Sequence, residues 1–191
     1  MTIERQAGYH VSEMILSRWS PRAMSAETIT DDELYSLFEA SRWAPSSYNN
    51  QPWRFFYAQR DGPGWDTLFS LLVPFNQSWA QHAAALVVLA SKKIFDDGSE
   101  SRTHSFDTGA AWQNLALQGS ANGLVVHGMQ GFDYDKAKEV LGLDDSYAVE
   151  MMIAIGKPGK PEEVLSESLQ QREKPSQRKS FSEFVFSIQD K

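Results

Sequence analysis

The segment Ala44-Pro45-Ser46-Ser47-Tyr48-Asn49-Asn50-Gln51-Pro52-Trp53 decides how the rest of this 191-residue chain is interpreted. It holds two serines, three amide side chains and a tyrosine between two prolines, which stiffen the backbone at both ends. Such a loop could present uncharged donors and acceptors to the edge of a heteroaromatic ring. It could equally be an elaborate turn between a helix and a strand, and the residues alone leave both interpretations open.

The segments on either side of this loop have clear periodicities. Before it, Thr30 and Glu33 have the spacing of a capping box, and the residues that follow on one helical face are apolar: Leu34, Leu37, Phe38 and Trp43. After it, the aromatic run Trp53 to Gln59 is typical of a strand. The sequence therefore predicts a helix that Pro45 stops, a loop, and a strand.

The remaining elements follow from the same reading of apolar spacing. Further helices are expected over residues 9–17, 65–72, 105–122, 133–142 and 162–170, with Pro74 ending the second of these. Further strands are expected over residues 84–90, 124–129, 147–155 and 181–186, and a mobile polar connection over 95–103. About five strands with five or six helices, without strict alternation, predict one α+β sandwich domain over residues 1–191 rather than a doubly wound sheet.

Composition narrows the classes of function. Apolar residues make up 41% and charged residues 23%, as in an ordinary soluble globular protein, and the net charge of −7 disfavours a nucleic-acid backbone as partner. The chain contains no cysteine, which excludes disulfides, thiolate catalysis and cysteine-ligated clusters. The start of the chain does not look like a secretory signal and no 18-residue apolar run occurs, so a cytoplasmic location is expected.

Common catalytic and nucleotide-binding motifs are missing. There is no Gly-x-Ser-x-Gly, no Gly-x-Gly-x-x-Gly and no Gly-x-x-x-x-Gly-Lys-Ser/Thr, and the four histidines are scattered singly, so no metal site is expected. A phosphate would have to be held by side chains. Arg18 with Ser20 and Arg178 with Lys179 are the candidates, because a guanidinium matches phosphate oxygens; solvated surface charge is the alternative.

Taken together, the chain resembles the FMN-dependent nitroreductase family over nearly its whole length. The matching elements, in order, are Arg18-Trp19-Ser20-Pro21-Arg22, Pro45 to Trp53, Pro74-Phe75-Asn76, Gly128-Met129-Gln130-Gly131-Phe132 and Pro175-Ser176-Gln177-Arg178-Lys179. The second of these, similar to the family's Pro-Ser-x-x-Asn-x-Gln-Pro-Trp loop, is the most specific.

The resemblance implies how FMN would be bound. Arg18, Ser20 and Arg178 would hold its phosphate, with Lys179 as a further candidate and Trp19 contributing backbone contacts. Arg22 would lie near the pyrimidine end of the flavin, where positive charge favours the reduced ring. The residues implied to reach the ring from the second subunit of a homodimer are Pro45, Ser46, Ser47 and Asn49, and those implied at the flavin edge are Asn76, Gln130 and Gly131.

Two positions depart from the pattern. Trp79 and Ser176 stand where some members of the family carry lysine, which implies weaker flavin binding or a lower flavin potential. The family fold also implies that residues 181–186 form an arm that pairs with the sheet of the partner subunit.

The implied activity is reduction of nitroaromatic, quinone or similar acceptors by a ping-pong reaction. NADH or NADPH would deliver hydride to bound FMN, and an acceptor chosen by loops around Trp79 and residues 96–102 would then replace the nicotinamide. No side chain is expected to be catalytic in itself, because the cofactor carries the chemistry. The alternatives are a specialist reductase of enals, aldehydes or halogenated compounds, a flavin-binding protein without turnover, and a structural domain.

Overall fold

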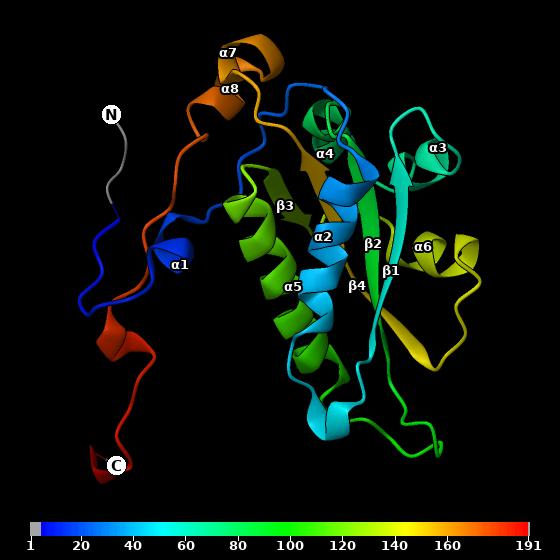
Figure 1. The fold of residues 1–191 in the computed structure, drawn as a ribbon, viewed down its shortest axis with the longest axis vertical. Helices are drawn as coiled ribbons and strands as arrows, with labels where there is room; N and C mark the ends of the chain where they lie inside the picture. The colour runs from blue at the N-terminus through cyan, green and yellow to red at the C-terminus, as the bar shows by residue number, and fades with distance from the viewer. Residues whose placement is uncertain (1–4, 191) are drawn as a thin grey trace.

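One antiparallel sheet organises the structure, which is a computed structural model that describes residues 5–190. The strands β1 (Trp53–Gln59), β2 (Ala85–Lys92), β4 (Tyr147–Gly156) and β3 (Val125–Met129) lie side by side in this order, so β1 and β3 are the edges. The helices are α1 (Glu13–Ser17), α2 (Asp31–Arg42), α3 (Trp65–Phe69), α4 (Pro74–Ala80), α5 (His104–Ala121), α6 (Tyr134–Val140), α7 (Pro161–Val164) and α8 (Glu167–Gln170) (Figure 1). The predicted α+β class is confirmed, with four strands in the described residues instead of about five.

Both faces of the sheet are covered, which explains why β2 is buried along almost its whole length. One face packs against α2 and α5 through side chains such as Leu37, Leu115 and Ile153. The other packs against α3, α4 and α6 through side chains such as Trp79 and Met152. The alternation of side chains along each strand divides the core between these two layers.

Local sequence signals explain most helix ends. The Thr30 hydroxyl accepts a hydrogen bond from the backbone N–H of Glu33 at 3.1 Å, and the Glu33 carboxylate accepts one from Thr30 at 2.7 Å, which confirms the predicted capping box. Asp133 caps α6, and Gly123 and Gly142 adopt positive φ just after α5 and α6. Pro74 does not end a helix as expected but begins α4, where its missing N–H has no helical partner to lose.

The C-terminal segment differs from its prediction. Residues 181–186 do not form a strand in the single chain; Phe181–Glu183 form a 3-10 turn. The Glu183 carboxylate accepts a hydrogen bond from the backbone N–H of Ser180 at 2.8 Å, so a capping signal outweighs the alternating apolar pattern. No neighbouring strand of the described chain offers this segment a ladder partner.

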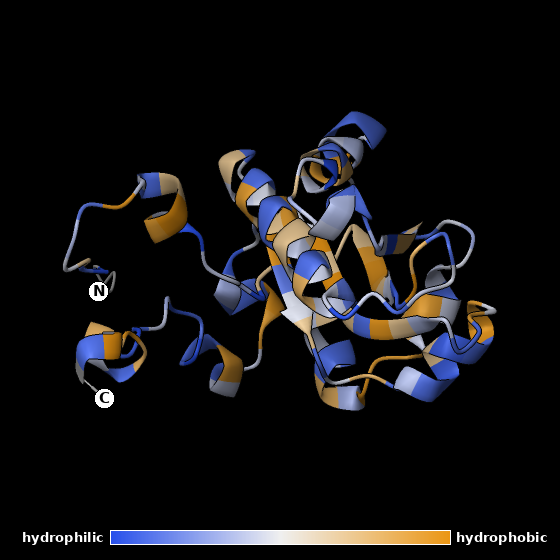
Figure 2. Ribbon diagram, turned by 90° about the horizontal axis from the view of Figure 1, so that it is seen from below, coloured by the Kyte–Doolittle hydropathy of each residue, from blue (hydrophilic) through white to orange (hydrophobic). Residues whose placement is uncertain are grey.

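Both ends of the chain extend away from the sheet on the same side (Figures 1 and 2). They touch through Tyr9 and Phe181, whose ring centroids are 5.4 Å apart. Exposed apolar side chains are frequent on them: Tyr9, Met14, Ile15, Phe184, Phe186 and Ile188. The first helix of this region is shorter than expected, Glu13–Ser17 instead of 9–17, and buries none of its residues. Among the described helices, none combines the length and apolar character needed to cross a membrane.

The contact between α5, α2 and the sheet requires a glycine at one position. A Cβ on Gly119 would lie 2.3 Å from Cγ2 of Val126 and 3.7 Å from Cδ2 of Leu37. Gly109, on the same helix, has open space around it. We expect Gly119→Ala to lower the free energy of unfolding by about 1–3 kcal/mol, the usual cost of overpacking. Gly109→Ala is the matched control and should raise it by up to about 1 kcal/mol. Urea denaturation measures both, and equal effects of the two substitutions would contradict this packing.

Candidate functional site

A positively charged cavity of about 380 Å³ lies along the open edge of β3. Its floor includes His127 and Gly128 of that strand. The other residues that line it come from the two ends of the chain: Arg5, Arg18, Trp19, Ser20, Arg22, Arg172, Lys174, Ser176 and Arg178. A neighbouring hollow of about 390 Å³ shares Arg5, Arg18, Ser176 and Arg178 with it and adds Lys179. We call the residues shared by the two hollows, together with Ser20, the basic cluster.

The arginines of the basic cluster face one another without a counter-charge. In residues 5–190, no carboxylate forms an ion pair with Arg5, Arg18 or Arg178. Burial, followed by the charges of Arg5 and Arg178, lowers the pKa of Arg18. Like charges held together in this way disfavour the empty cavity, so the cluster is suited to an anion.

Hydroxyl groups complete the cluster. The Arg18 guanidinium donates to Oγ of Ser20 at 3.2 Å, and that of Arg178 donates to Oγ of Ser176 at 2.8 Å. Arg5 is fixed by its own bonds to the backbone carbonyls of Leu16 (2.9 Å) and Arg18 (2.6 Å). The set of donors fits a phosphate monoester, and the Nε atoms of Arg5 and Arg22 are buried without a partner in the described chain.

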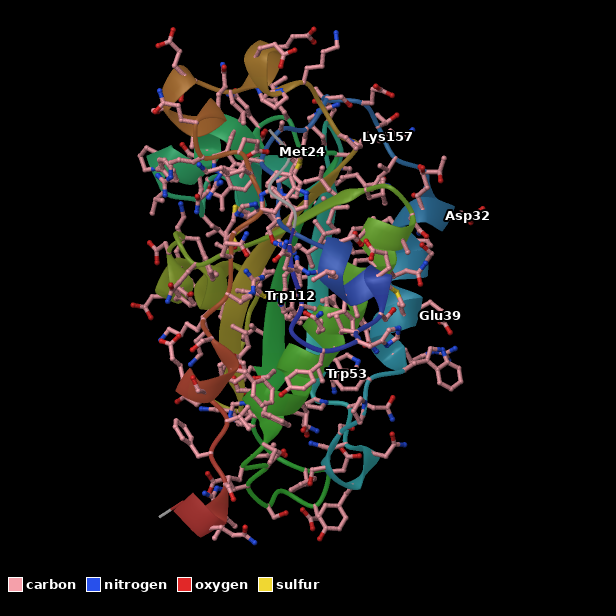
Figure 3. The ribbon with its side chains drawn as sticks, turned by 90° about the vertical axis from the view of Figure 1, so that its left-hand side faces the viewer. Met24, Asp32, Glu39, Trp53, Trp112 and Lys157 are labelled. Carbon is pink, nitrogen blue, oxygen red and sulfur yellow. The ribbon has the colours of Figure 1, made fainter. Side chains whose placement is uncertain are left out.

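The segment that carries Arg18 to Arg22 is pinned to the body at its far end. The Glu173 carboxylate, buried and 4% exposed, accepts from the backbone N–H groups of Arg22 (2.5 Å) and Ala23 (2.8 Å). Beyond it, Met24 bridges to Pro158 and the N–H of Ser25 donates to Lys157 at 3.0 Å. Met24 and Lys157 lie at the end of the sheet opposite Trp53 (Figure 3).

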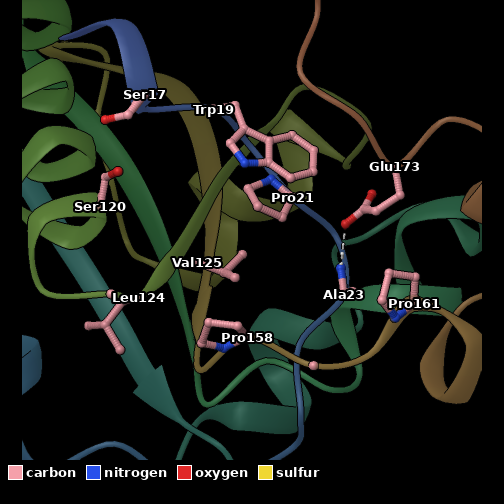
Figure 4. A pocket seen from close by; sticks show the side chains of 12 residues that line it. Ser17, Trp19, Pro21, Ala23, Ser120, Leu124, Val125, Pro158, Pro161 and Glu173 are labelled. Carbon is pink, nitrogen blue, oxygen red and sulfur yellow. Dashed lines mark hydrogen bonds between the residues drawn. The ribbon is translucent and has the colours of Figure 1, made fainter. Parts of the chain in front are cut away.

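A separate hollow of about 360 Å³ lies behind this segment (Figure 4). Trp19, Pro21 and Pro158 form much of its wall, and Glu173 reaches in toward Ala23. Glu173 therefore lies between this hollow and Arg22, whose guanidinium is 3.8 Å from Oε2 of Glu173. Burial lowers the pKa of Arg22, against the opposing effect of Glu173.

His127 forms part of the floor of the charged cavity. Its Nδ1 is 2.8 Å from the carbonyl oxygen of Pro21, which can only accept, so Nδ1 carries the hydrogen. Trp79 packs against the imidazole with ring centroids 4.6 Å apart. Burial lowers the pKa of His127 to about 4, so its ring is neutral at pH 7.

The turn after β3 is built by Asn76. Its Nδ2 donates to the carbonyl oxygen of Gly131 at 2.9 Å, and a Cβ at Gly131 would lie 2.7 Å from that nitrogen. Outside the sheet ladder, neither the backbone N–H of Gln130 nor that of Gly131 donates to another described residue. The amide group of Asn76 therefore shapes the turn. Gln130, on the same turn, is exposed.

The Pro45 to Trp53 loop lies apart from the basic cluster, at the end of the sheet where β1 begins (Figure 1). Tyr48, Asn49 and Gln51 have φ of 51°, 55° and 47°, a strained conformation for residues with side chains. Its contacts include two hydrogen bonds at 3.0 Å: Oγ of Ser46 accepts from the N–H of Gln51, and Asp107 accepts from the N–H of Ser47. This rigid loop leaves Tyr48 93% exposed.

The structure therefore brings together only some of the predicted site residues. Those that gather in or beside the charged cavity are Arg18, Trp19, Ser20, Arg22, Arg178 and Lys179. Asn49 instead lines a hollow of about 660 Å³ with Phe95, Asp96 and Asp97, and Pro45, Ser46 and Ser47 line none of the four described hollows. One chain thus places the predicted site residues in two separate regions.

Three residues were missed or misplaced by the sequence analysis. Arg5 and His127 belong to no motif, and nothing in their spacing signals a place in the cavity. Trp79, expected at loops around the acceptor, is fully buried beneath His127 and cannot line an open face.

Comparison with known proteins identifies the family of this chain. The model of the nitroreductase family matches residues 15–64 and 65–157 of this chain. A protein of Archaeoglobus fulgidus that carries the name "Putative NADH dehydrogenase/NAD(P)H nitroreductase" is 27% identical over 150 residues, which cover 76% of this chain and 84% of the relative.

Solved structures agree with the sequence match. A crystal structure described as an oxidoreductase containing FMN superposes with a TM-score of 0.91 at 39% identity, covering 96% of this chain and 94% of the other. A nitroreductase family protein from Clostridium difficile 630 shares the fold, with a TM-score of 0.71 at 22% identity and coverage of 94% and 99%.

The low pKa of His127 predicts a pH dependence of stability. An ordinary histidine binds a proton below about pH 6.5, whereas His127 in the folded state binds one only near pH 4. Above about pH 6.5 the imidazole is neutral in both the folded and the unfolded state, so its burial then costs no stability through protonation. As pH falls from about 6.5 toward 4, the free energy of unfolding should decrease by up to about 1.4 kcal/mol per pH unit. Urea denaturation at pH 7 and 5 should show a smaller decrease in the free energy of unfolding for His127→Asn than for the parent protein. His10→Asn serves as the control. An NMR titration of His127 with a midpoint near 6.5 would contradict the assignment.

Proposed function

Because the chain belongs to the nitroreductase family, we propose that it is an FMN-dependent oxidoreductase that uses NADH or NADPH to reduce nitroaromatic, quinone or similar acceptors by a ping-pong mechanism. The observation that carries the proposal is the basic cluster without a counter-charge, beside the open turn at Gln130 and Gly131. When bound, FMN would accept hydride from the nicotinamide and pass it to the acceptor.

The residues of this chain would bind and tune the cofactor. Arg18, Ser20 and Arg178 would hold the phosphate, as the sequence analysis expects, and Arg5 joins them because its charge faces the same cavity. Lys179 and the backbone at Trp19 would contribute at the margin of the cluster.

Arg22 would face the pyrimidine end of the ring. Glu173 partly offsets its charge at 3.8 Å, so Arg22 would stabilise negative charge on a reduced ring less than an unpaired arginine would. The N–H groups of Gln130 and Gly131 would be available as donors at the flavin edge, on a turn that Asn76 holds in place.

We further propose a homodimer whose sites combine both halves. The separation of the loop from the basic cluster in one chain supports this: Asn49 lines a different hollow and Pro45, Ser46 and Ser47 line neither, while a second copy could bring these residues to a flavin. The exposed apolar side chains of the two chain ends, including Phe184 and Phe186, provide surface that a partner would cover. Exchange of residues 181–186 with the partner's sheet stays a prediction, as does the cytoplasmic location.

The purified protein provides the direct test. We expect flavin absorbance bands, either as isolated or after addition of FMN, and their bleaching by NADH or NADPH under anaerobic conditions. A protein that does not bind added FMN would refute the proposal. A bound flavin that neither NADH nor NADPH reduces would indicate a flavin-binding protein without turnover.

The phosphate assignment has its own test. Arg18→Ala should weaken FMN binding by about 1.5–3 kcal/mol, the usual scale for a hydrogen bond to a charged group. Arg42→Ala, which removes an exposed arginine of α2 paired with Glu39, should leave FMN binding unchanged. Fluorescence titration measures both constants, and equal constants for Arg18→Ala and the parent protein would refute the assignment.

The dimer is tested by charging the C-terminal segment. The double substitution Phe184→Asp and Phe186→Asp should give a monomer with weakened FMN binding, because charge is costly in an apolar interface. Val140→Asp, on the outer side of α6, is the control for an exposed apolar residue elsewhere. Light scattering after size-exclusion chromatography determines the mass, and a monomeric parent protein would overturn the dimer proposal.

A further inference from the structure

The side chains that line the charged cavity are mostly hydrogen-bond donors, and one of them offers an acceptor that carries no hydrogen of its own. Arginine and lysine side chains can only donate hydrogen bonds, and they make up most of its lining. Each serine hydroxyl accepts one hydrogen bond, Ser20 from Arg18 and Ser176 from Arg178, and keeps its own hydrogen to donate. Among the described side chains that line the cavity, Nε2 of His127 is the acceptor that carries no hydrogen of its own.

The tautomer of His127 is fixed by its surroundings. Because Nδ1–H donates to the carbonyl of Pro21, the lone pair of the neutral ring lies on Nε2. Within residues 5–190 no hydrogen bond involves Nε2, and Nε2 is not among the buried polar atoms without a partner, unlike Nε1 of the underlying Trp79. The backbone carbonyl of Ser20 also lies near the imidazole. Because His127 lines the charged cavity and its Nδ1 is taken by Pro21, Nε2 is the ring nitrogen left for a ligand there.

We propose that Nε2 of His127 accepts a hydrogen bond from a hydroxyl of the ribityl chain of FMN, and so positions the chain between the phosphate and the ring. This inference rests on the proposed function. A phosphate offers only acceptors to the basic cluster, whereas the alcohol chain next to it carries donors, which matches one acceptor beside a set of cations. Burial keeps the pKa of His127 near 4, so the lone pair is retained at neutral pH.

Trp79 helps to fix the position of the His127 imidazole. It is fully buried and packs on the imidazole at 4.6 Å, so the ring is held between the indole and the Pro21 carbonyl. The indole at position 79 packs against the imidazole at an interplanar angle of 53°, where a lysine would add another positive charge.

His127→Asn separates the two functions of the imidazole. The asparagine amide can reproduce the Nδ1–H bond to Pro21 but has no atom at the position of Nε2. In a fluorescence titration of the FMN-free protein at pH 7, we expect this variant to bind FMN about three- to tenfold more weakly, the range for one neutral hydrogen bond. Affinity for inorganic phosphate, measured by calorimetry, should stay within about twofold of the parent value if the basic cluster is intact. His82→Asn, remote from the cavity, is the matched control and should change neither constant.

Several outcomes would overturn the proposal. Unchanged FMN affinity of His127→Asn would do so, and an equal loss of phosphate affinity would show that the substitution only distorts the cavity. If the parent protein bound phosphate but not FMN, the proposed function would fail as well. If the parent bound FMN and NADPH bleached it while His127→Asn bound FMN equally well, this inference alone would fail.

The parent protein offers a second measurement in case the variant does not fold. In a long-range ¹H–¹⁵N NMR correlation, Nε2 of His127 should be unprotonated and should shift upfield when FMN is added, as an acceptor nitrogen does on forming a hydrogen bond. An unchanged Nε2 signal at saturating FMN would overturn the proposal.

Discussion

The charged cavity depends on holding three arginines together against their mutual repulsion. Arg5, Arg18 and Arg178 come from opposite ends of the chain and meet at the open edge of β3 without a carboxylate among the described residues to balance them. Their desolvation and mutual repulsion lower the pKa of Arg18, which means that the protein bears a free-energy cost to keep the cluster assembled. A dianionic ligand would remove that cost and fasten the two chain ends at the same time.

The surrounding contacts serve to keep the charges in place. Glu173 does not neutralise the basic cluster; it holds the backbone at Arg22 and Ala23 and moderates Arg22 alone. His127 ties Pro21 to β3 with a ring that stays neutral and so adds no further positive charge. The site is therefore divided into a charged part for an anion and a neutral part beside it.

The sequence predicted most of the fold because its signals were local. The capping box at Thr30, the glycines after α5 and α6, and the aromatic strand β1 depend on neighbouring residues, and each formed as expected. Pro74 and the segment 181–186 were misjudged because each local signal has two meanings: proline both stops and starts helices, and an apolar run can follow a capping serine, here Ser180. The family motifs located Arg18 and Ser20, but Arg5, His127 and Glu173 act through tertiary contacts that no spacing in the sequence reveals. For the Pro45 to Trp53 loop, the resemblance implies contact with a flavin of the second subunit, and that role stays a prediction because one chain does not bring the loop to the basic cluster.

If the chain is an FMN-dependent oxidoreductase as proposed, the basic cluster binds the phosphate of the flavin. Calorimetric titration of the FMN-free protein with FMN and with riboflavin, which lacks the phosphate, tests this. Because three arginines and two hydroxyls would then bind one dianion, riboflavin should bind on the order of 100-fold more weakly than FMN. Equal affinities for the two ligands would refute this role, because the cluster would then contribute nothing to flavin binding.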